Sequence, residues 1–263
     1  MRFVSFDALH TLISFRQPMV QTYAAVAAKH GLPLDAGKLE TAFRTNFKQY
    51  QKEYPCFGYY GFPGNNGEQT LFSDGNNSKR WWLSLVKLCL VESAASRSED
   101  FARDETLLGS IAIALYEHFH GGDPWLEVPG AKEVLERLHK DRKYQLLVVS
   151  NWDYRLRKIL ADLHLLQFFH PRGIFLAGET GLAKPDPRVF RLVLERLGIT
   201  DSAQVIHVGD DVEKDYAASK AVGCRSILLC HPSEDTEKEG VIPSKHKIRS
   251  LFELEDALEC YGR

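Results

Sequence analysis

The sequence predicts an α/β protein in which a doubly wound, parallel, Rossmann-like sheet carries an inserted all-helical cap domain. Short apolar runs alternate with amphipathic helical patterns after about residue 126, which is typical of a parallel sheet covered by helices. Another apolar run, at residues 3–6, is separated from the next by about 110 residues without a convincing strand, far more than a crossover needs. We therefore expect residues 1–15 and 126–263 to form the core and residues 16–125 to form the cap domain.

The later strands are apolar runs rich in β-branched residues, and the later helices repeat apolar side chains at helical spacing. The expected strands are 144–149, 172–176, 204–208 and 226–230, and the expected helices are 131–140, 155–163, 188–197 and 213–222. Three residues are expected to cap helices: Asp186 as an N-cap, with Pro187 at the first helical position, Asp153 as another N-cap, and Gly223 as a C-terminal cap.

The inserted segment shows four helical patterns, near residues 19–30, 36–51, 78–92 and 105–119. Its expected inward-facing residues are Tyr23, Leu39, Phe43, Phe47, Trp82, Leu85, Leu108, Ile111 and Leu115. Trp81 and Trp82 are interpreted as packing residues. Residues 54–77 are rich in Gly, aromatic and Asn residues, which predicts a loop that either lines a substrate entrance or is a mobile surface excursion.

Composition excludes several classes of partner. The chain has 263 residues, of which 44% are hydrophobic, and its net charge is −2 without a dense basic block, so we expect neither a nucleic-acid nor a membrane partner. Its five cysteines lack CxxC spacing, which argues against zinc and disulfides and favours a reducing compartment. We expect a cytoplasmic protein, or an organellar one if a transit peptide has been removed, and the oligomeric state stays open.

Chemically useful side chains stand where the expected strands end. In chain order they are Asp7, then Ser150 with Asn151, and finally Asp210 with Asp211. The carboxyl ends of parallel strands meet at one edge of a sheet, where open α/β sheets place their ligands. Asp7 is therefore a candidate nucleophile.

An aspartate that attacks a phosphate dianion must overcome charge repulsion, so the site needs a metal ion and a fixed cation. Carboxylate oxygens suit Mg²⁺, and the candidates are Asp7, Asp210, Asp211 and Asp215. Lys184 supplies the cation, and the Ser150 hydroxyl can hydrogen-bond the transferred group as charge develops.

Together with the turn at residues 184–187, these motifs resemble the haloacid dehalogenase-like (HAD) hydrolase superfamily, in its helical-cap type. The resemblance implies that Asp7 forms an aspartyl-phosphate and that Ser150 and Lys184 are catalytic. It implies Mg²⁺ as cofactor, with the metal ligands Asp7, the Leu9 carbonyl, Asp210, Asp215 and, less directly, Asp211. The expected substrate is a small phosphorylated metabolite, bound by Asn151 and Thr11. Arg80-Trp81-Trp82 and Ser150-Asn151 are also similar to a eukaryotic subgroup, the HAD-like hydrolase domain-containing protein 3 group.

Leu9 departs from the phosphatase pattern. HAD phosphatases have an aspartate there, which protonates the leaving alcohol and later activates water. His10 is either a substitute acid–base group, since an unperturbed histidine has a pKa of about 6.5, or a partly exposed loop residue.

Two alternative functions stay open. One is a non-catalytic module that binds a phosphorylated metabolite or a protein, and the other is a metal-free haloacid dehalogenase, which also lacks that aspartate and has a Ser-Asn pair.

Overall fold

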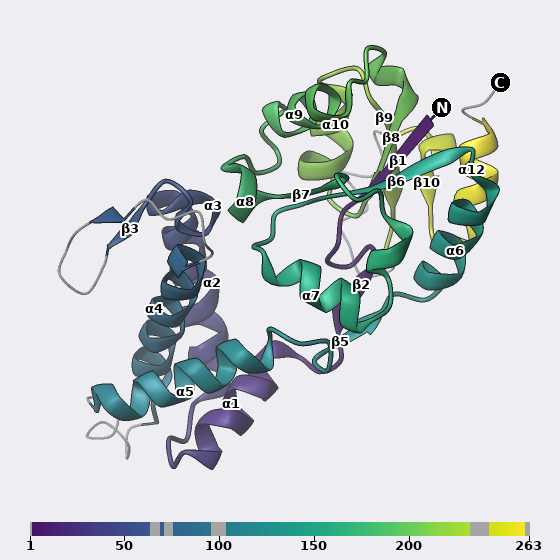
Figure 1. Cartoon of the computed structure of the whole chain (residues 1–263). Helices are drawn as coiled ribbons and strands as arrows, with labels where there is room; N and C mark the ends of the chain where they lie inside the picture. The colour runs from purple at the N-terminus through teal and green to yellow at the C-terminus, as the bar shows by residue number, and fades with distance from the viewer. Residues whose placement is uncertain (1, 64–68, 71–75, 96–103, 232–241, 261–263) are drawn as a thin grey trace.

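A six-stranded parallel sheet forms the centre of the fold, as the sequence predicts (Figure 1). The computed structural model describes residues 2–63, 69–70, 76–95, 104–231 and 242–260. The strand order is β10-β9-β8-β1-β6-β7, and all neighbouring strands are parallel. The strands are β1 Arg2–Phe6, β6 Tyr144–Ser150, β7 Ile174–Leu176, β8 Val205–Gly209, β9 Arg225–Leu229 and β10 Lys247–Ile248. The sequence did not reveal β10, because two residues are too short for a periodic signal.

Helices cover both faces of this sheet. They are α6 Ala131–Asp141, α7 Arg155–Asp162, α8 Ala177–Thr180, α9 Arg188–Leu197, α10 Ala218–Lys220 and α12 Leu254–Cys260, with shorter turns η3 Leu166–Phe168, η4 Ser202–Gln204, η6 Ser244–His246 and η7 Leu251–Glu253. Side chains of β6 alternate between two hydrophobic clusters. Val148 packs in the cluster that contains α6, α7 and α12, whereas Val149 packs in the cluster that contains α9. The sheet is therefore doubly wound, as predicted.

The segment between β1 and β6 is mainly helical. Its helices are α1 Met19–Lys29, α2 Ala36–Glu53, α3 Pro55–Gly58, α4 Asn76–Ser93 and α5 Glu105–His118. Two antiparallel strand pairs accompany them, β2 Ile13–Phe15 with β5 Trp125–Glu127, and β3 Phe62–Pro63 with β4 Gln69–Thr70. Of these, only the β3–β4 pair lies well inside residues 16–125, and its two-residue strands are too short for a period-2 pattern. Apart from this pair, the described part of the insertion is helical, as predicted. The β2–β5 pair lies at the expected domain boundary, whose position stays a prediction.

Helices α1 to α5, which we call the helical insertion, share a hydrophobic cluster that also includes Ala177 of α8. Six predicted inward-facing residues are buried in it, namely Tyr23, Leu39, Leu85, Leu108, Ile111 and Leu115. Trp81 is also fully buried, so its packing role is confirmed. Phe43, Phe47 and Trp82 are only partly buried and line a cavity instead. Within the described residues, no helix combines the length and apolar character that a membrane crossing requires.

The predicted loop 54–77 is partly ordered into α3. Cys56 and Phe57 there have left-handed backbone angles, with φ of 53° and 58°, so α3 is a turn of mixed handedness. The Phe57 side chain is buried and lines two cavities. This part of the loop therefore contributes to a pocket wall, whereas residues 64–68 and 71–75 lie outside the described residues.

The predicted caps are present with small shifts. The Asp186 carboxylate accepts a hydrogen bond from the Arg188 amide at 2.9 Å, although α9 begins at Arg188 itself. Gly223 follows α10 with φ of 83°, as a C-terminal cap should. The expected 213–222 helix starts differently, as the π-helix η5 Val212–Ala217, and the Asp211 carboxylate caps it through the amides of Glu213 and Lys214.

Candidate functional site

The carboxyl ends of β1, β6 and β8 bring the predicted site residues together. Phe6 in β1 pairs with Val148 in β6 and with Val208 in β8, so these three strands end within two residues of one another at one edge of the sheet. The Asp7 amide continues this pairing by donating to the Val208 carbonyl at 2.9 Å. Asp7, Ser150 and Asp210 therefore line one cavity, which the loop before α9 and helix η5 complete with Lys184 and Asp215.

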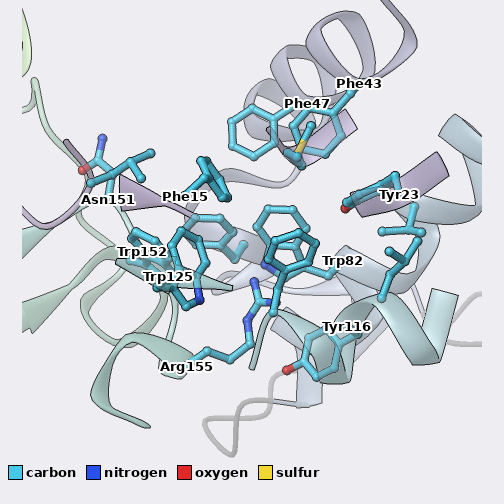
Figure 2. Close-up of a pocket in the computed structure, with 16 residues that line it drawn as sticks. Phe15, Tyr23, Phe43, Phe47, Trp82, Tyr116, Trp125, Asn151, Trp152 and Arg155 are labelled. Atoms are coloured by element: carbon cyan, nitrogen blue, oxygen red, sulfur yellow. The ribbon is translucent and has the colours of Figure 1, made fainter. Parts of the chain in front are cut away.

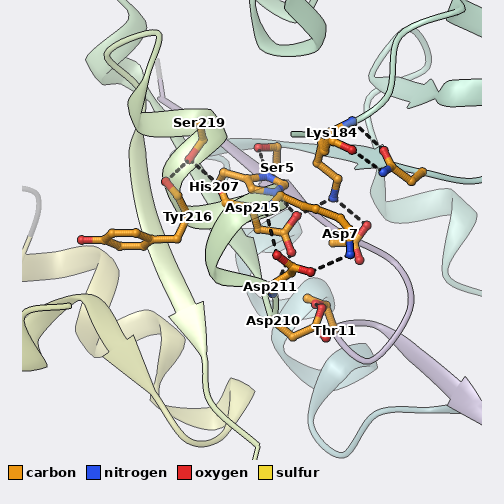
Figure 3. Close-up of polar contacts among 12 residues, drawn as sticks. Ser5, Asp7, Thr11, Lys184, His207, Asp210, Asp211, Asp215, Tyr216 and Ser219 are labelled. Carbon is orange, nitrogen blue, oxygen red and sulfur yellow. Dashed lines mark hydrogen bonds and ion pairs between the residues drawn. The ribbon is translucent and has the colours of Figure 1, made fainter. Parts of the chain in front are cut away.

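Three carboxylates and one lysine form the centre of the site (Figure 3). One oxygen from each of Asp7, Asp210 and Asp215 lies within 4.8 Å of the others. The Lys184 ammonium donates to Asp7 Oδ1 at 2.7 Å and to Asp215 Oδ1 at 2.5 Å. Three negative charges against one positive charge leave an excess that a divalent cation would balance, and an all-oxygen donor set fits Mg²⁺.

Lys184 is held in its charged form and in one position. Burial opposes its charge, but the carboxylates of Asp215 and Asp7 outweigh burial and raise the lysine pKa. Its backbone is clamped by Asn151, whose Nδ2 donates to the Lys184 carbonyl at 2.6 Å and whose Oδ1 accepts from the Lys184 amide at 2.7 Å. Asn151 lines the cavity, but its amide group positions Lys184, and its predicted role in substrate binding stays a prediction.

A buried polar chain, not predicted from the sequence, supports Asp215. His207 Nε2 lies 3.1 Å from Asp215 Oδ1, and His207 Nδ1 lies 2.9 Å from Ser5 Oγ (Figure 3). Burial lowers the His207 pKa, and Lys184 together with His207 overcomes burial to lower the Asp215 pKa. A neutral imidazole must then donate from Nε2 to the carboxylate and accept the Ser5 hydroxyl proton at Nδ1. Single polar residues within apolar strands carry no motif, which is why these partners were missed.

Gly209 permits this arrangement. A Cβ atom at Gly209 would lie 2.3 Å from the Asp215 carboxylate, closer than nonbonded atoms can approach. The Asp215 side chain thus lies directly across the end of β8, where its second oxygen accepts the Asp211 amide at 3.0 Å. Only glycine leaves that space open.

Two predicted site residues lie beside the carboxylate group. Asp211 caps η5 and pairs with Lys214 at 2.6 Å, so its carboxylate is engaged outside the three-carboxylate group. Thr11 is fully buried, and its hydroxyl donates to Asp210 Oδ1 at 3.4 Å. Thr11 is not among the residues that line the cavity. Its contact in this structure is with Asp210, whose carboxylate it helps to position.

The carboxylates open into a cavity of about 450 Å³. Leu9 and His10 both line it, next to Asp7. His10 has a left-handed backbone, with φ of 61°, and its carbonyl accepts from His231 Nε2 at 2.7 Å. The histidine is exposed in a turn, yet it faces the cavity, so both interpretations of His10 stay open.

A second, mostly apolar cavity of about 380 Å³ lies under the helical insertion (Figure 2). Leu9, Phe47, Phe57, Asn151 and Trp152 line both cavities, so the two are adjacent. The sequence could not predict this space, because helices α1, α2, α4 and α5, strands β2 and β5 and the loop after β6 all contribute to its wall.

A buried ion pair joins the core to the helical insertion at this wall. Asp153 accepts the Arg155 amide, as predicted for a cap, but it also binds the Arg155 guanidinium at 2.8 Å. The Trp82 indole donates to Asp153 at 2.6 Å, and the guanidinium lies 4.7 Å from the ring centroids of Trp82 and Tyr116. Burial would raise the Asp153 pKa, but the Arg155 charge lowers it, so both groups stay charged.

Comparisons with known proteins agree with this geometry. Residues 1–223 match the family model described as haloacid dehalogenase-like hydrolase. Haloacid dehalogenase-like hydrolase domain-containing protein 3 from Xenopus laevis is 31% identical over 254 residues, which cover 97% of this chain and 94% of the relative. The fold resembles a 2-haloacid dehalogenase from Pseudomonas syringae, with a TM-score of 0.65, 20% identity and 99% coverage of both chains. It also resembles the putative hydrolase YfnB from Bacillus subtilis bound to magnesium, with a TM-score of 0.61, 20% identity and 98% coverage of both. The chain therefore belongs to the haloacid dehalogenase-like hydrolase family.

Proposed function

We propose that this chain is a Mg²⁺-dependent hydrolase of a small phosphomonoester, with Asp7 as the nucleophile. The observation that carries the proposal is the Lys184 ammonium between Asp7 and Asp215, with Asp210 beside them. This set places a nucleophile, a fixed cation and oxygen ligands within one cavity, as attack on a phosphate dianion requires. The magnesium bound to the Bacillus subtilis protein supports the same ion here.

Each residue of the cavity has a distinct role in this reaction. An Asp7 oxygen forms a bond to phosphorus, the bond to the leaving oxygen breaks, and water later releases phosphate from Asp7. Lys184 offsets the charge of Asp7 and of the phosphate, and the Ser150 hydroxyl donates to a phosphoryl oxygen as charge develops. Asp7, Asp210 and Asp215 would hold Mg²⁺, which supplies charge stabilisation for the transferred group when bound. We also propose that the helical insertion is a cap domain that shields this cavity from water.

Leu9 limits this chemistry. Its side chain lines the cavity beside Asp7 but can neither protonate a leaving alcohol nor activate water. We therefore propose that turnover is slow. His10, which lines the same cavity, is the nearest candidate for a substitute acid–base group.

We predict that phosphate release from a panel of phosphomonoesters requires both Mg²⁺ and Asp7. The Asp7→Asn variant keeps the shape of the side chain but lacks the nucleophilic oxygen, so release should fall to background. Asp201→Asn is a matched control, because Asp201 caps η4 at the opposite end of β8 and lines neither cavity. Equal release by wild type and Asp7→Asn, or release that survives EDTA, would overturn the proposal. Phosphate binding without release would favour the non-catalytic module.

A metal-free haloacid dehalogenase is the second candidate. Leu9 and the apolar cavity beside Asp7 favour it, because a halide leaves without a proton. Proteins described as dehalogenase and as phosphatase both occur among the structural matches. Halide release from 2-haloacids in the presence of EDTA, lost in Asp7→Asn, would replace the phosphatase proposal.

A further inference from the structure

The apolar cavity is built for a flat hydrophobic group. Most of its polar lining groups are engaged within the protein, the Asn151 amide with Lys184 and the Arg155 guanidinium with Asp153. The Trp82 indole N–H also binds Asp153, and the Tyr116 hydroxyl lies 2.5 Å from the Tyr154 hydroxyl. Trp125 Nε1, in contrast, is a buried N–H without a hydrogen-bond partner among the described residues. A sugar or polyol in this space would lose several hydrogen bonds to water and find few free partners to replace them.

Aromatic side chains form most of the remaining wall (Figure 2). Phe57 stacks on Trp82 with ring centroids 5.9 Å apart, and Phe15 lies against Trp125 at 4.6 Å. Aromatic walls favour an aromatic ligand, because offset stacking and edge-to-face contacts add to simple burial. Phe57 has a left-handed backbone, which is unusual for a bulky residue. This conformation directs its ring toward the wall that the two cavities share.

The apolar cavity also adjoins the proposed site of phosphoryl transfer. Leu9, two residues after Asp7, lines both spaces. A molecule whose phosphate lies beside Asp7 and Lys184 would therefore reach the apolar cavity by extending its leaving group past Leu9. The volume of about 380 Å³ suits a group of one or two rings.

Leu9 points to the same substrate by a separate chemical argument. A leaving group that departs without a proton needs no acid at this position. A phenol has a pKa of about 10, as in tyrosine, whereas water has a pKa of about 15.7 and aliphatic alcohols lie near water. A phenolate is therefore a much better leaving group, and the absence of an aspartate costs little in the step that transfers the phosphoryl group from an aryl ester to Asp7.

We infer that the substrate is a phosphate monoester of an aromatic alcohol, with its ring in the apolar cavity. This inference rests on the proposed function. An Asp7 oxygen bonds to phosphorus while the bond between phosphorus and the aryl oxygen breaks, and the phenolate leaves with the electron pair and takes a proton from water. Water then attacks phosphorus, the bond to Asp7 breaks, and phosphate is released.

The test compares 2-naphthyl phosphate, hexyl phosphate and glycerol phosphate, together with direct binding of 2-naphthol, which needs no catalysis. We expect kcat/KM for the naphthyl ester to exceed that for both alkyl esters by about 100-fold or more, because the missing acid costs alkyl esters 10²–10⁴. Hexyl phosphate separates the effect of the leaving group from that of apolar binding.

A cavity-filling variant adds a second readout. Met19→Trp should weaken naphthol binding and raise KM for naphthyl phosphate about tenfold, while KM for methyl phosphate stays unchanged, since Met19 lines the apolar cavity only. Ile113→Trp, on the exposed face of α5, is the matched control and should alter neither naphthol binding nor KM for naphthyl phosphate. A preference for glycerol phosphate without naphthol binding would overturn this inference and leave the proposed function in place. No hydrolysis of any ester would overturn both.

Discussion

The Leu9→Asp variant is expected to hydrolyse alkyl phosphomonoesters about 10²–10⁴-fold faster than the wild-type protein. Leu9 lies next to Asp7, the proposed nucleophile, and lines the cavity where the leaving group would sit. An aspartate there can protonate the leaving alcohol and then activate the water that attacks the phosphorylated Asp7. The new carboxylate would face the cavity that also contains Lys184, and Leu9 is only partly buried, so the fold should accept it.

Steady-state kinetics with hexyl phosphate would measure this gain. Leu9→Asn is the matched control, because asparagine has the size and polarity of aspartate but cannot transfer a proton at neutral pH. A Leu9→Asp rate no higher than that of Leu9→Asn would contradict the assigned position of the leaving group. If a His10→Ala variant lost the residual wild-type rate, the histidine would be the present acid–base group.

Replacing Asp153 with alanine should destabilise the protein by about 3–5 kcal/mol, the usual cost of leaving one partner of a buried ion pair unpaired. Asp153 is fully buried and Arg155 is 5% exposed. The substitution also removes the acceptor of the Trp82 indole N–H, which joins the helical insertion to the core. Urea unfolding followed by circular dichroism would give the difference in free energy.

Asp186→Ala is the matched control for this prediction. Asp186 and Arg188 repeat the same spacing and the same backbone contact as Asp153 and Arg155, but the Arg188 side chain is 67% exposed. Its loss should cost about 1–2 kcal/mol, as expected for a cap and a surface ion pair. Equal destabilisation by the two variants would show that burial of the Asp153–Arg155 pair does not increase its contribution to the free energy of unfolding. The double variant Asp153→Ala/Arg155→Met should recover part of the loss, because it leaves no unpaired charge.

Sequence reasoning was most successful where a local residue pattern determines the secondary structure. The apolar runs before Asp7, Ser150 and Asp210 became β1, β6 and β8, and parallel pairing then placed their following residues at one edge. Lys184 and Asp215 joined them, as the motifs predicted. Hydrophobic periodicity and strand-end chemistry were sufficient for this part of the site.

The remaining features depend on contacts between distant residues that carry no motif. Trp82 and Asp153 are 71 positions apart, and Ser5 and His207 are 202 apart. Each residue has an ordinary packing or capping interpretation when taken alone. The strands β3 and β4 and the π-helical start of η5 were missed for another reason: they are too short or too irregular to produce a periodic signal.

The most direct test of the central claim is to trap the phosphorylated enzyme. Wild-type protein would be mixed with 2-naphthyl phosphate and Mg²⁺, quenched in acid during turnover and examined by intact-mass and peptide-mapping mass spectrometry. We predict one added phosphoryl group, on Asp7, which accumulates because Leu9 cannot activate water, and none in Asp7→Asn. Turnover without a phosphorylated protein, or a phosphoryl group on another residue, would contradict the account.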